Sequence, residues 1–160
     1  MRTGEQFAPC ATLLSVLMLM NCFEKSDERH GEIIICLAFD ERKKSRGKAI
    51  SREGQVVAWF LQRGESLRQG DVLKTDCGHL VQIVAAAEPV SKGITDDPFL
   101  LTRAAYHLGN RHVPIQVEPM SLLYQSDHVL DDMLRGLGLS VEKVDSVFQP
   151  EGGAYHNHGH

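Results

Sequence analysis

The sequence has few of the features that mark secreted, membrane or nucleic-acid-binding proteins. Its four cysteines include no Cys-x-x-Cys pair, so it predicts neither a zinc knuckle nor a disulfide framework, and a reducing cytoplasm fits best. The formal net charge of -4 over 160 residues provides no basic face for phosphate, so we expect no nucleic-acid partner. The apolar run Leu13–Met20 is too short to cross a bilayer, and we expect no membrane partner.

Catalytic signatures are also missing. The sequence has no phosphate-binding glycine loop, no Gly-x-Ser-x-Gly elbow, no His-Glu-x-x-His, and no cysteine placed beside a histidine as a thiolate nucleophile would be. Paired carboxylates occur at Asp96-Asp97 and Asp131-Asp132, but both pairs fall in or near the first turns of predicted helices. The backbone dipole favours negative charge there without any catalytic role. The sequence therefore predicts a protein that is not an enzyme.

Residues 1–30 have no clear place in the expected fold. The run Leu13–Met20 resembles the apolar region of a signal peptide, but the Asn-Cys that follows is a poor match to the small residues of a cleavage site. Met18 and Met20 offer alternative translation starts. We therefore expect residues 1–30 to be an extension outside the fold, either disordered or a mis-called start.

Residues 31–76 predict a small β-rich domain with no convincing helix. Glu32–Phe39 is short, β-branched and apolar, as a buried strand is. Ala49–Ser51 and Gln55–Leu61 flank a turn in which Gly54 can supply the positive φ that a hairpin needs.

Two features of this β-rich domain have competing interpretations. Trp59 lies within an apolar strand, so we expect it in the core rather than as a ligand platform. The basic run Glu41–Arg46 is interpreted as a solvated turn or an exposed edge strand, with a docking patch for an acidic partner as the alternative.

From residue 77 onward the pattern predicts helices and strands in the order β-α-β-β-α-β. Asp97 and Pro98 form a helix start, and apolar residues follow at helical spacing up to Leu108. We expect a ferredoxin-like domain over residues 77–149, in which two helices cover one face of a four-stranded sheet. The fold class is therefore α+β, a small all-β domain followed by a ferredoxin-like domain and a flexible histidine-containing tail over residues 150–160. The remaining predicted segments are the strand Leu80–Ala87, a loop at Pro89–Thr95, the strands Val113–Val117 and Ser121–Gln125, a helix capped by Ser126 or Asp127, and the strand Leu139–Phe148.

Histidine is the residue type whose placement indicates chemistry. His112 follows Gly109 and Asn110, which we expect to close a helix in the left-handed conformation, and it precedes Pro114, which prevents a return to helix. A histidine on such a short connector can present its imidazole to something outside its own core. In the tail, histidine recurs at every second position, a pattern typical of metal binding, at His156, His158 and His160.

Two further histidines are auxiliary candidates for metal binding. His107 lies near the expected helix end, where stabilisation of the helix or a surface hydrogen bond is as good an interpretation as ligation. His128 falls in the first turn of the second helix, with Asp131 and Asp132 three and four residues on. A carboxylate could orient its ring in an accessory metal site, although a simple polar contact also explains the spacing.

The residues around His112 also carry a family likeness. Ala104–Pro114, with the sequence AAYHLGNRHVP, resembles the signature of the urease accessory nickel chaperones, the UreE family. Further stretches match that family in order, from about Ile33 to the C-terminus, and residues 1–30 lie outside the likeness. They are Phe39–Arg46, Leu67–Leu73, Asp127–Leu134 and the Pro-Glu-Gly-Gly-Ala-Tyr segment that leads into the tail.

The resemblance implies a homodimer in which His112 of each subunit meets its counterpart near the two-fold axis and holds one Ni²⁺ ion. The tail histidines would complete or feed this site. The β-rich domain would engage partners, which are an accessory GTPase and the urease apoprotein with its accessory complex. Some members have a His-x-His pair at the start of the second helix, but here Ser126 stands in place of the first histidine of that pair, with only His128 present.

Alternatives remain open because imidazole also binds Zn²⁺ and Cu²⁺, and the affinity order does not favour nickel over copper. The chain could be a general divalent metal storage or buffering protein that binds Zn²⁺, Cu²⁺ or Ni²⁺ mainly through its tail. It could also be a scaffold that acts through the β-rich domain without any metal.

Overall fold

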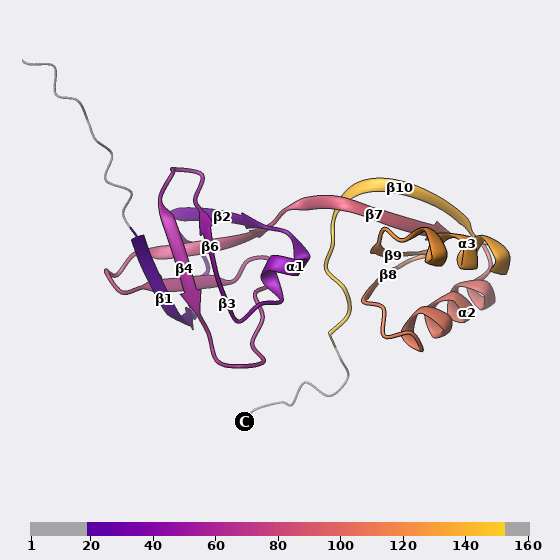
Figure 1. The fold of residues 1–160 in the computed structure, drawn as a ribbon, viewed down its shortest axis with the longest axis horizontal. Helices are drawn as coiled ribbons and strands as arrows, with labels where there is room; N and C mark the ends of the chain where they lie inside the picture. Colours follow the sequence, from indigo (N-terminus) through magenta and orange to yellow (C-terminus); the bar gives the residue numbers. More distant parts are fainter. Residues whose placement is uncertain (1–18, 153–160) are drawn as a thin grey trace, which may run out of the picture.

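The computed structural model describes residues 19–152, which form two β-sheets linked by the direct passage from β6 to β7 (Figure 1). A six-stranded sheet belongs to the N-terminal domain, and a four-stranded sheet with two helices belongs to the C-terminal domain. In chain order the elements are β1 (Leu19–Ser26), β2 (Ile33–Leu37), α1 (Phe39–Arg42), β3 (Arg46–Ile50), β4 (Val56–Phe60), β5 (Val72–Thr75), β6 (Leu80–Ala85), β7 (Ala87–Ile94), α2 (Pro98–Gly109), β8 (Ile115–Glu118), β9 (Ser121–Gln125), α3 (His128–Leu137) and β10 (Ser140–Val147).

Strand β1 lies inside the N-terminal sheet, whose order is β2-β6-β5-β1-β4-β3. It pairs in parallel with β4 and antiparallel with β5. The side chains of Met20 and Cys22 are buried in the core, whereas those of Leu19 and Phe23 are exposed. The expectation that residues 1–30 lie outside the fold is therefore wrong for Leu19–Ser26, because the partner strands that order this segment come later in the chain. Residues 1–18 of that expected extension lie outside the described residues.

The predicted hairpin is confirmed as β3 and β4, which pair antiparallel around a turn where Gly54 has a φ of +89°. Trp59 is in the core, as expected, with 2% of its surface exposed. Its indole N–H donates to the Lys44 carbonyl at 3.0 Å. A Cβ atom on Gly47 would lie 2.3 Å from the indole ring, so β3 can cover Trp59 only with a glycine at this position.

The boundary between the domains lies later than residue 77. Strand β6 pairs with β2 and β5, so it belongs to the N-terminal sheet, and the C-terminal domain begins with β7. The expected loop at Pro89–Thr95 is wrong, because most of it forms β7. This strand pairs with β10 along its whole length but with β9 only from Val90 onward. Pro89 therefore lies where the strand has a neighbour on one side, and a proline is tolerated there.

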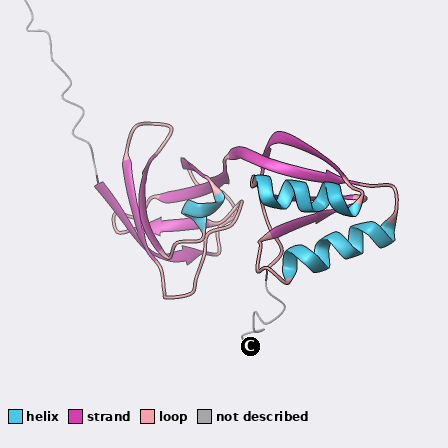
Figure 2. Cartoon of the chain, turned by 45° about the vertical axis from the view of Figure 1, so that its right-hand side comes forward, coloured by secondary structure: helices cyan, strands magenta, loops and turns pink. Residues whose placement is uncertain are grey.

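The C-terminal domain runs β7-α2-β8-β9-α3-β10, and its antiparallel sheet has the order β10-β7-β9-β8. Both helices cover the same face of this sheet (Figure 2). Asp97 and Asp127 cap them as the sequence predicts, because each carboxylate accepts a hydrogen bond from the first turn of its helix. The buried side chains between the helices and the sheet are Ala104, Leu108, Leu122, Tyr124, Leu134 and Leu139. Within residues 19–152 no helix is long and apolar enough to cross a membrane.

The short helix α1 contacts both domains and joins them. The sequence predicted no helix here, only a solvated basic turn. Arg42 is only 3% exposed, and its guanidinium donates to the carbonyls of Leu37, in the N-terminal domain, and Phe148, in the C-terminal segment. The rings of Phe39 and Phe148 meet edge to face, with centroids 5.2 Å apart. The Phe39 N–H also donates to the Glu88 carboxylate at 2.7 Å. The interpretation of Glu41–Arg46 as solvated is therefore wrong at Arg42, whose burial lowers the pKa of its guanidinium.

Candidate metal site

His112 lies on the connector between α2 and β8, in the left-handed conformation with a φ of +56°. Its N–H donates to the Gly109 carbonyl at 2.9 Å, and the Val113 N–H donates to the Leu108 carbonyl at 3.1 Å. These two bonds form the motif that usually closes a helix with glycine in the left-handed position. The expectation that Gly109 and Asn110 take this conformation is wrong, because Asn110 remains right-handed at φ -64° and His112 turns the chain instead.

The backbone of His112 is therefore held in a conformation that is unfavourable by about 1–2 kcal/mol for a residue other than glycine. Such strained positions cluster at functional sites, where the surrounding structure holds them. Here Val113 packs with Leu108 in the C-terminal core and so fixes the far side of the turn. The imidazole is left exposed to solvent at a defined place.

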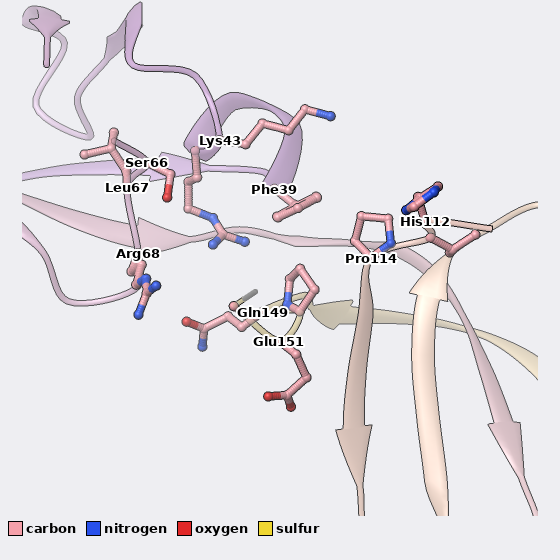
Figure 3. Close-up of a pocket in the computed structure, with 13 residues that line it drawn as sticks. Phe39, Lys43, Ser66, Leu67, Arg68, His112, Pro114, Gln149 and Glu151 are labelled. Atoms are coloured by element: carbon pink, nitrogen blue, oxygen red, sulfur yellow. The ribbon is translucent and has the colours of Figure 1, made fainter. Parts of the chain in front are cut away.

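A cavity of about 560 Å³ lies between the domains and includes His112 in its lining (Figure 3). The N-terminal domain contributes Lys43 and Arg68 to the lining, and the rest of the chain contributes His112 and Glu151. The Glu151 N–H donates to the Ile115 carbonyl at 2.8 Å, which holds the C-terminal segment beside β8. Gly152, the last described residue, also lines the cavity. The chain therefore reaches the start of the histidine tail at the same cavity as His112.

The charges around this cavity do not favour a bare divalent cation. Lys43 and Arg68 are exposed cationic side chains, and Glu151 is the carboxylate that lines the cavity. Lys43 forms an ion pair with Asp40 at 2.6 Å, and hydrogen bonds from Lys43 and Gln125 lower the pKa of that carboxyl group. A single imidazole in such surroundings needs further ligands to hold a metal ion.

The described part of the chain does not supply those ligands. Within residues 19–152 no group of three or more histidine, cysteine, aspartate or glutamate side chains is arranged to hold a metal ion. Cys22 is buried, and its burial, with Asp76 and Cys77 nearby, raises the pKa of its thiol to about 12, so it is not a thiolate ligand at neutral pH. The tail candidates His156, His158 and His160 lie outside the described residues.

The two auxiliary candidates are on different helices. His107 lies in the last turn of α2, with its ring 5.4 Å from the Tyr106 ring, and its carbonyl accepts a hydrogen bond from the Arg111 guanidinium. His128 is the first residue of α3 and is exposed. No hydrogen bond among the described residues joins His128 to the nearby carboxylates.

Those carboxylates, Asp131 and Asp132, have other partners. Asp131 is buried and accepts a hydrogen bond from the Tyr124 hydroxyl at 2.8 Å. Burial and this carboxylate raise the pKa of Tyr124 above its ordinary value. Asp132 accepts from the Arg135 guanidinium at 3.0 Å on the surface. The structure therefore gives Asp131 a role in packing α3 against β9.

Replacing Tyr124 by phenylalanine is expected to lower the free energy of unfolding by about 1.5 kcal/mol, because the buried Asp131 carboxylate loses its hydroxyl donor. Urea denaturation of both proteins measures the difference. The matched control is Asp132→Ala, which removes an exposed ion pair and should change stability by less than about 0.5 kcal/mol. Equal losses in the two variants would contradict the structural role given to Asp131.

Sequence reasoning missed that Lys43, Arg68 and Glu151 lie close to His112. These residues come from segments far apart in the chain, so no local pattern connects them. A signal was nevertheless present. Four of the five stretches that carry the family likeness contribute residues to this one cavity, and Asp127–Leu134 does not; the four are Phe39–Arg46, Leu67–Leu73, Ala104–Pro114 and the Pro-Glu-Gly segment.

Comparison with known proteins agrees with this arrangement of two domains. Residues 24–86 match the model of the UreE urease accessory protein, N-terminal domain, and residues 88–160 match that of the C-terminal domain. The urease accessory protein UreE of Saccharophagus degradans is 47% identical over 133 residues, covering 83% of this chain and 79% of that protein. The UreE of Teredinibacter turnerae is 52% identical over 125 residues, covering 78% of this chain and 81% of that protein. The UreE of Proteus mirabilis is 51% identical over 124 residues, covering 78% of this chain and 77% of that protein. The chain therefore belongs to the UreE family of urease accessory proteins.

Proposed function

We propose that this protein is a cytoplasmic, homodimeric nickel chaperone that delivers Ni²⁺ for assembly of the urease active site. His112 of each subunit is the central ligand, and His156, His158 and His160 of the tail complete or load the site. The observation that carries the proposal is the exposed His112, held at φ +56° on the cavity where the described C-terminal segment ends. The family consists of accessory proteins rather than enzymes, so the proposed role is delivery and not catalysis.

The proposal assigns a role to each domain. We assign the C-terminal domain a ferredoxin-like fold and the metal-binding role; its element order and its two helices on one face of the sheet support the fold. The N-terminal domain engages partners, which are an accessory GTPase and the urease apoprotein with its accessory complex. Neither a membrane nor nucleic acid is part of the proposed function.

A two-fold dimer is supported by the exposed side of α2, the helix that ends three residues before His112. Helix α2 exposes Phe99 and Tyr106, at 68% and 67%, seven residues apart and therefore on one side of the helix. Exposed aromatic residues aligned in this way are typical of a protein interface. Only a residue beside the axis of a two-fold contact meets its own counterpart, and we place His112 there, so that one His112 per chain provides two imidazole ligands.

Incomplete coordination within one chain suits delivery. Two imidazoles at a subunit interface leave other positions of the ion for tail histidines or water, and such a site can release its ion by exchanging those ligands. Imidazole must be neutral to ligate, so nickel uptake should weaken as pH falls through the range where free imidazole titrates, near 6.5. Nickel affinity that is unchanged between about pH 7.5 and 5.5 would contradict an all-histidine site.

Nickel titration calorimetry with mass determination tests the proposal on three proteins: the wild type, His112→Ala and a chain that ends at Ala154. Delivery predicts about one tight Ni²⁺ ion per dimer, absent in His112→Ala and bound more weakly by the shortened chain. A buffering protein would bind several weaker ions that survive His112→Ala. A scaffold would bind its partners equally well with and without metal. Parallel titrations with Zn²⁺ and Cu²⁺ measure selectivity.

Tyr106→Glu is expected to convert the dimer to a monomer, because a buried carboxylate without a partner opposes association. Nickel affinity should then fall by at least about tenfold, since half of the paired imidazoles are lost. Sedimentation and calorimetry on the same sample measure both effects. The control is Val129→Glu, which adds a carboxylate at an exposed position of α3. A Tyr106→Glu protein that stays dimeric would contradict the proposed interface.

A further inference from the structure

The N-terminal domain exposes an apolar surface on the side of its sheet that faces away from the core. Strands β1, β4 and β3 are neighbours in this sheet (Figure 1), and paired residues on neighbouring strands point to the same face. Leu19 pairs with Val56, which pairs with Ile50. Leu19 and Ile50 are exposed at 58% and 67%. We call the outward side chains of these three strands the apolar face.

Two stacked aromatic rings form the other end of the apolar face. Phe23 on β1 and Phe60 on β4 have ring centroids 5.7 Å apart, with an angle of 22° between the rings. They remain 60% and 43% exposed. Phe23 lies at the position where the pairing of β1 with β5 shifts register between Cys22 and Glu24. The parallel register of β1 with β4, in which Cys22 pairs with Trp59, places the next residues, Phe23 and Phe60, side by side.

The fold does not need these outward side chains for its core. The core of the N-terminal domain lies on the opposite side of the same strands, where Met20, Cys22, Val57 and Trp59 are buried. Alternation along each strand separates the two sets. Exposed aromatic and aliphatic side chains gathered on one face, rather than scattered singly, mark an interaction surface.

One edge of the apolar face is basic. Strand β3 contributes Arg46 and Lys48 to it, opposite Phe60 and Ala58. Both are exposed, and no ion pair in the described part of the chain involves either of them. The chain as a whole has a net charge of -4, so this positive charge is a local feature. Charge of this sign steers an acidic partner and disfavours a basic one.

We propose that the apolar face binds a partner-protein segment in which apolar side chains are flanked by aspartate or glutamate. Phe23 and Phe60 would cover the apolar side chains, and Arg46 and Lys48 would pair with the flanking carboxylates. A second copy of this chain fits less well, because Arg46 and Lys48 give its apolar face the same positive charge. The inference rests on the proposed partner-binding role of the N-terminal domain and specifies where and what it binds.

A pair of synthetic peptides provides the test, one with a Phe-Val-Leu centre between Asp and Glu residues and one with the same centre between lysines. Amide NMR spectra of the full chain are expected to show shifts on β1, β3 and β4 with the acidic peptide, and an affinity at least about tenfold higher than for the lysine peptide. Phe60→Thr should lower the affinity for the acidic peptide by about tenfold. Lys48→Glu should reverse the preference, so that the lysine peptide binds more tightly than the acidic one. Val147→Thr on β10, another partly exposed apolar side chain, is the control and should change neither affinity.

Equal affinity for the two peptides, or shifts confined to other elements, would overturn the proposal. So would self-association of the wild type that Phe60→Thr abolishes, since the occupant would then be a second copy. If Phe60→Thr fails to fold, as judged by its amide spectrum, the exposed Lys48→Glu variant decides the result. Nickel titration of the same proteins distinguishes failure of this inference from failure of the proposed function. If the wild type binds peptide but no nickel, the metal role alone is refuted. If the wild type binds nickel but no peptide, this inference alone is refuted.

Discussion

His112→Gly is expected to abolish tight nickel binding and yet to be more stable than His112→Ala by about 1 kcal/mol. The two variants remove the same imidazole, so they should lose the same ion. They differ in the backbone, because His112 has a φ of +56°. Glycine adopts this conformation freely, whereas alanine opposes it by about 1–2 kcal/mol. The greater freedom of glycine in the unfolded chain offsets about 0.5–1 kcal/mol of that difference.

Urea denaturation of the metal-free proteins measures the stability difference, and calorimetry with Ni²⁺ measures the ion bound. The stability difference and the loss of nickel binding together identify the role of His112. A histidine kept only for structure would leave nickel binding intact in one of the variants. A glycine variant less stable than the alanine variant would contradict the left-handed turn itself. If both variants lose nickel and the glycine variant is the more stable, then a histidine at position 112 lowers stability but provides the imidazole ligand.

The features that sequence analysis predicted correctly depend on neighbouring residues. Asp97 and Asp127 cap helices through their own first turns, and Gly54 turns a hairpin whose strands adjoin it. His112 became a candidate ligand for a similar reason, since its spacing from the helix end and from Pro114 is local; its role as a ligand stays a prediction. The conformation of that turn was mistaken, because glycine and asparagine are intrinsically preferred in it, and only the bonds to Leu108 and Gly109 show that the histidine takes it.

The features that were missed depend on residues far apart in the chain. Strand β1 is ordered by parallel pairing with β4, and β7 overrides the turn preference of Pro89 by pairing with β10. Arg42 occurs in a run of charged residues that predicts exposure. Its side chain is buried instead, where it donates to the carbonyl of Phe148, more than one hundred residues later in the chain. The cavity beside His112 has the same origin, because it exists only once α1 has joined the domains.

Arg42→Met should lower the free energy of unfolding by about 2–3 kcal/mol. The Phe148 carbonyl has no other donor among the described residues, so it would be left buried and unpaired, whereas the Leu37 carbonyl keeps its bond from the Ala86 N–H. Methionine fills a similar volume and removes a buried charge, whose desolvation already lowers the pKa of Arg42, so the loss should be smaller than the sum of two charged hydrogen bonds. Urea denaturation measures the change.

The same experiment shows whether α1 couples the domains, because the chain has a separate probe for each. Trp59 is the single tryptophan and reports on the N-terminal domain by fluorescence, whereas the two long helices of the C-terminal domain dominate the circular dichroism. In the wild type the two transitions should coincide, as in cooperative unfolding, and in Arg42→Met they should separate. The control is Lys43→Met, in the same run but exposed, which should leave the transitions together. Coincident transitions in Arg42→Met would mean that the contacts of Phe39 with Phe148 and Glu88 suffice to join the domains without the guanidinium.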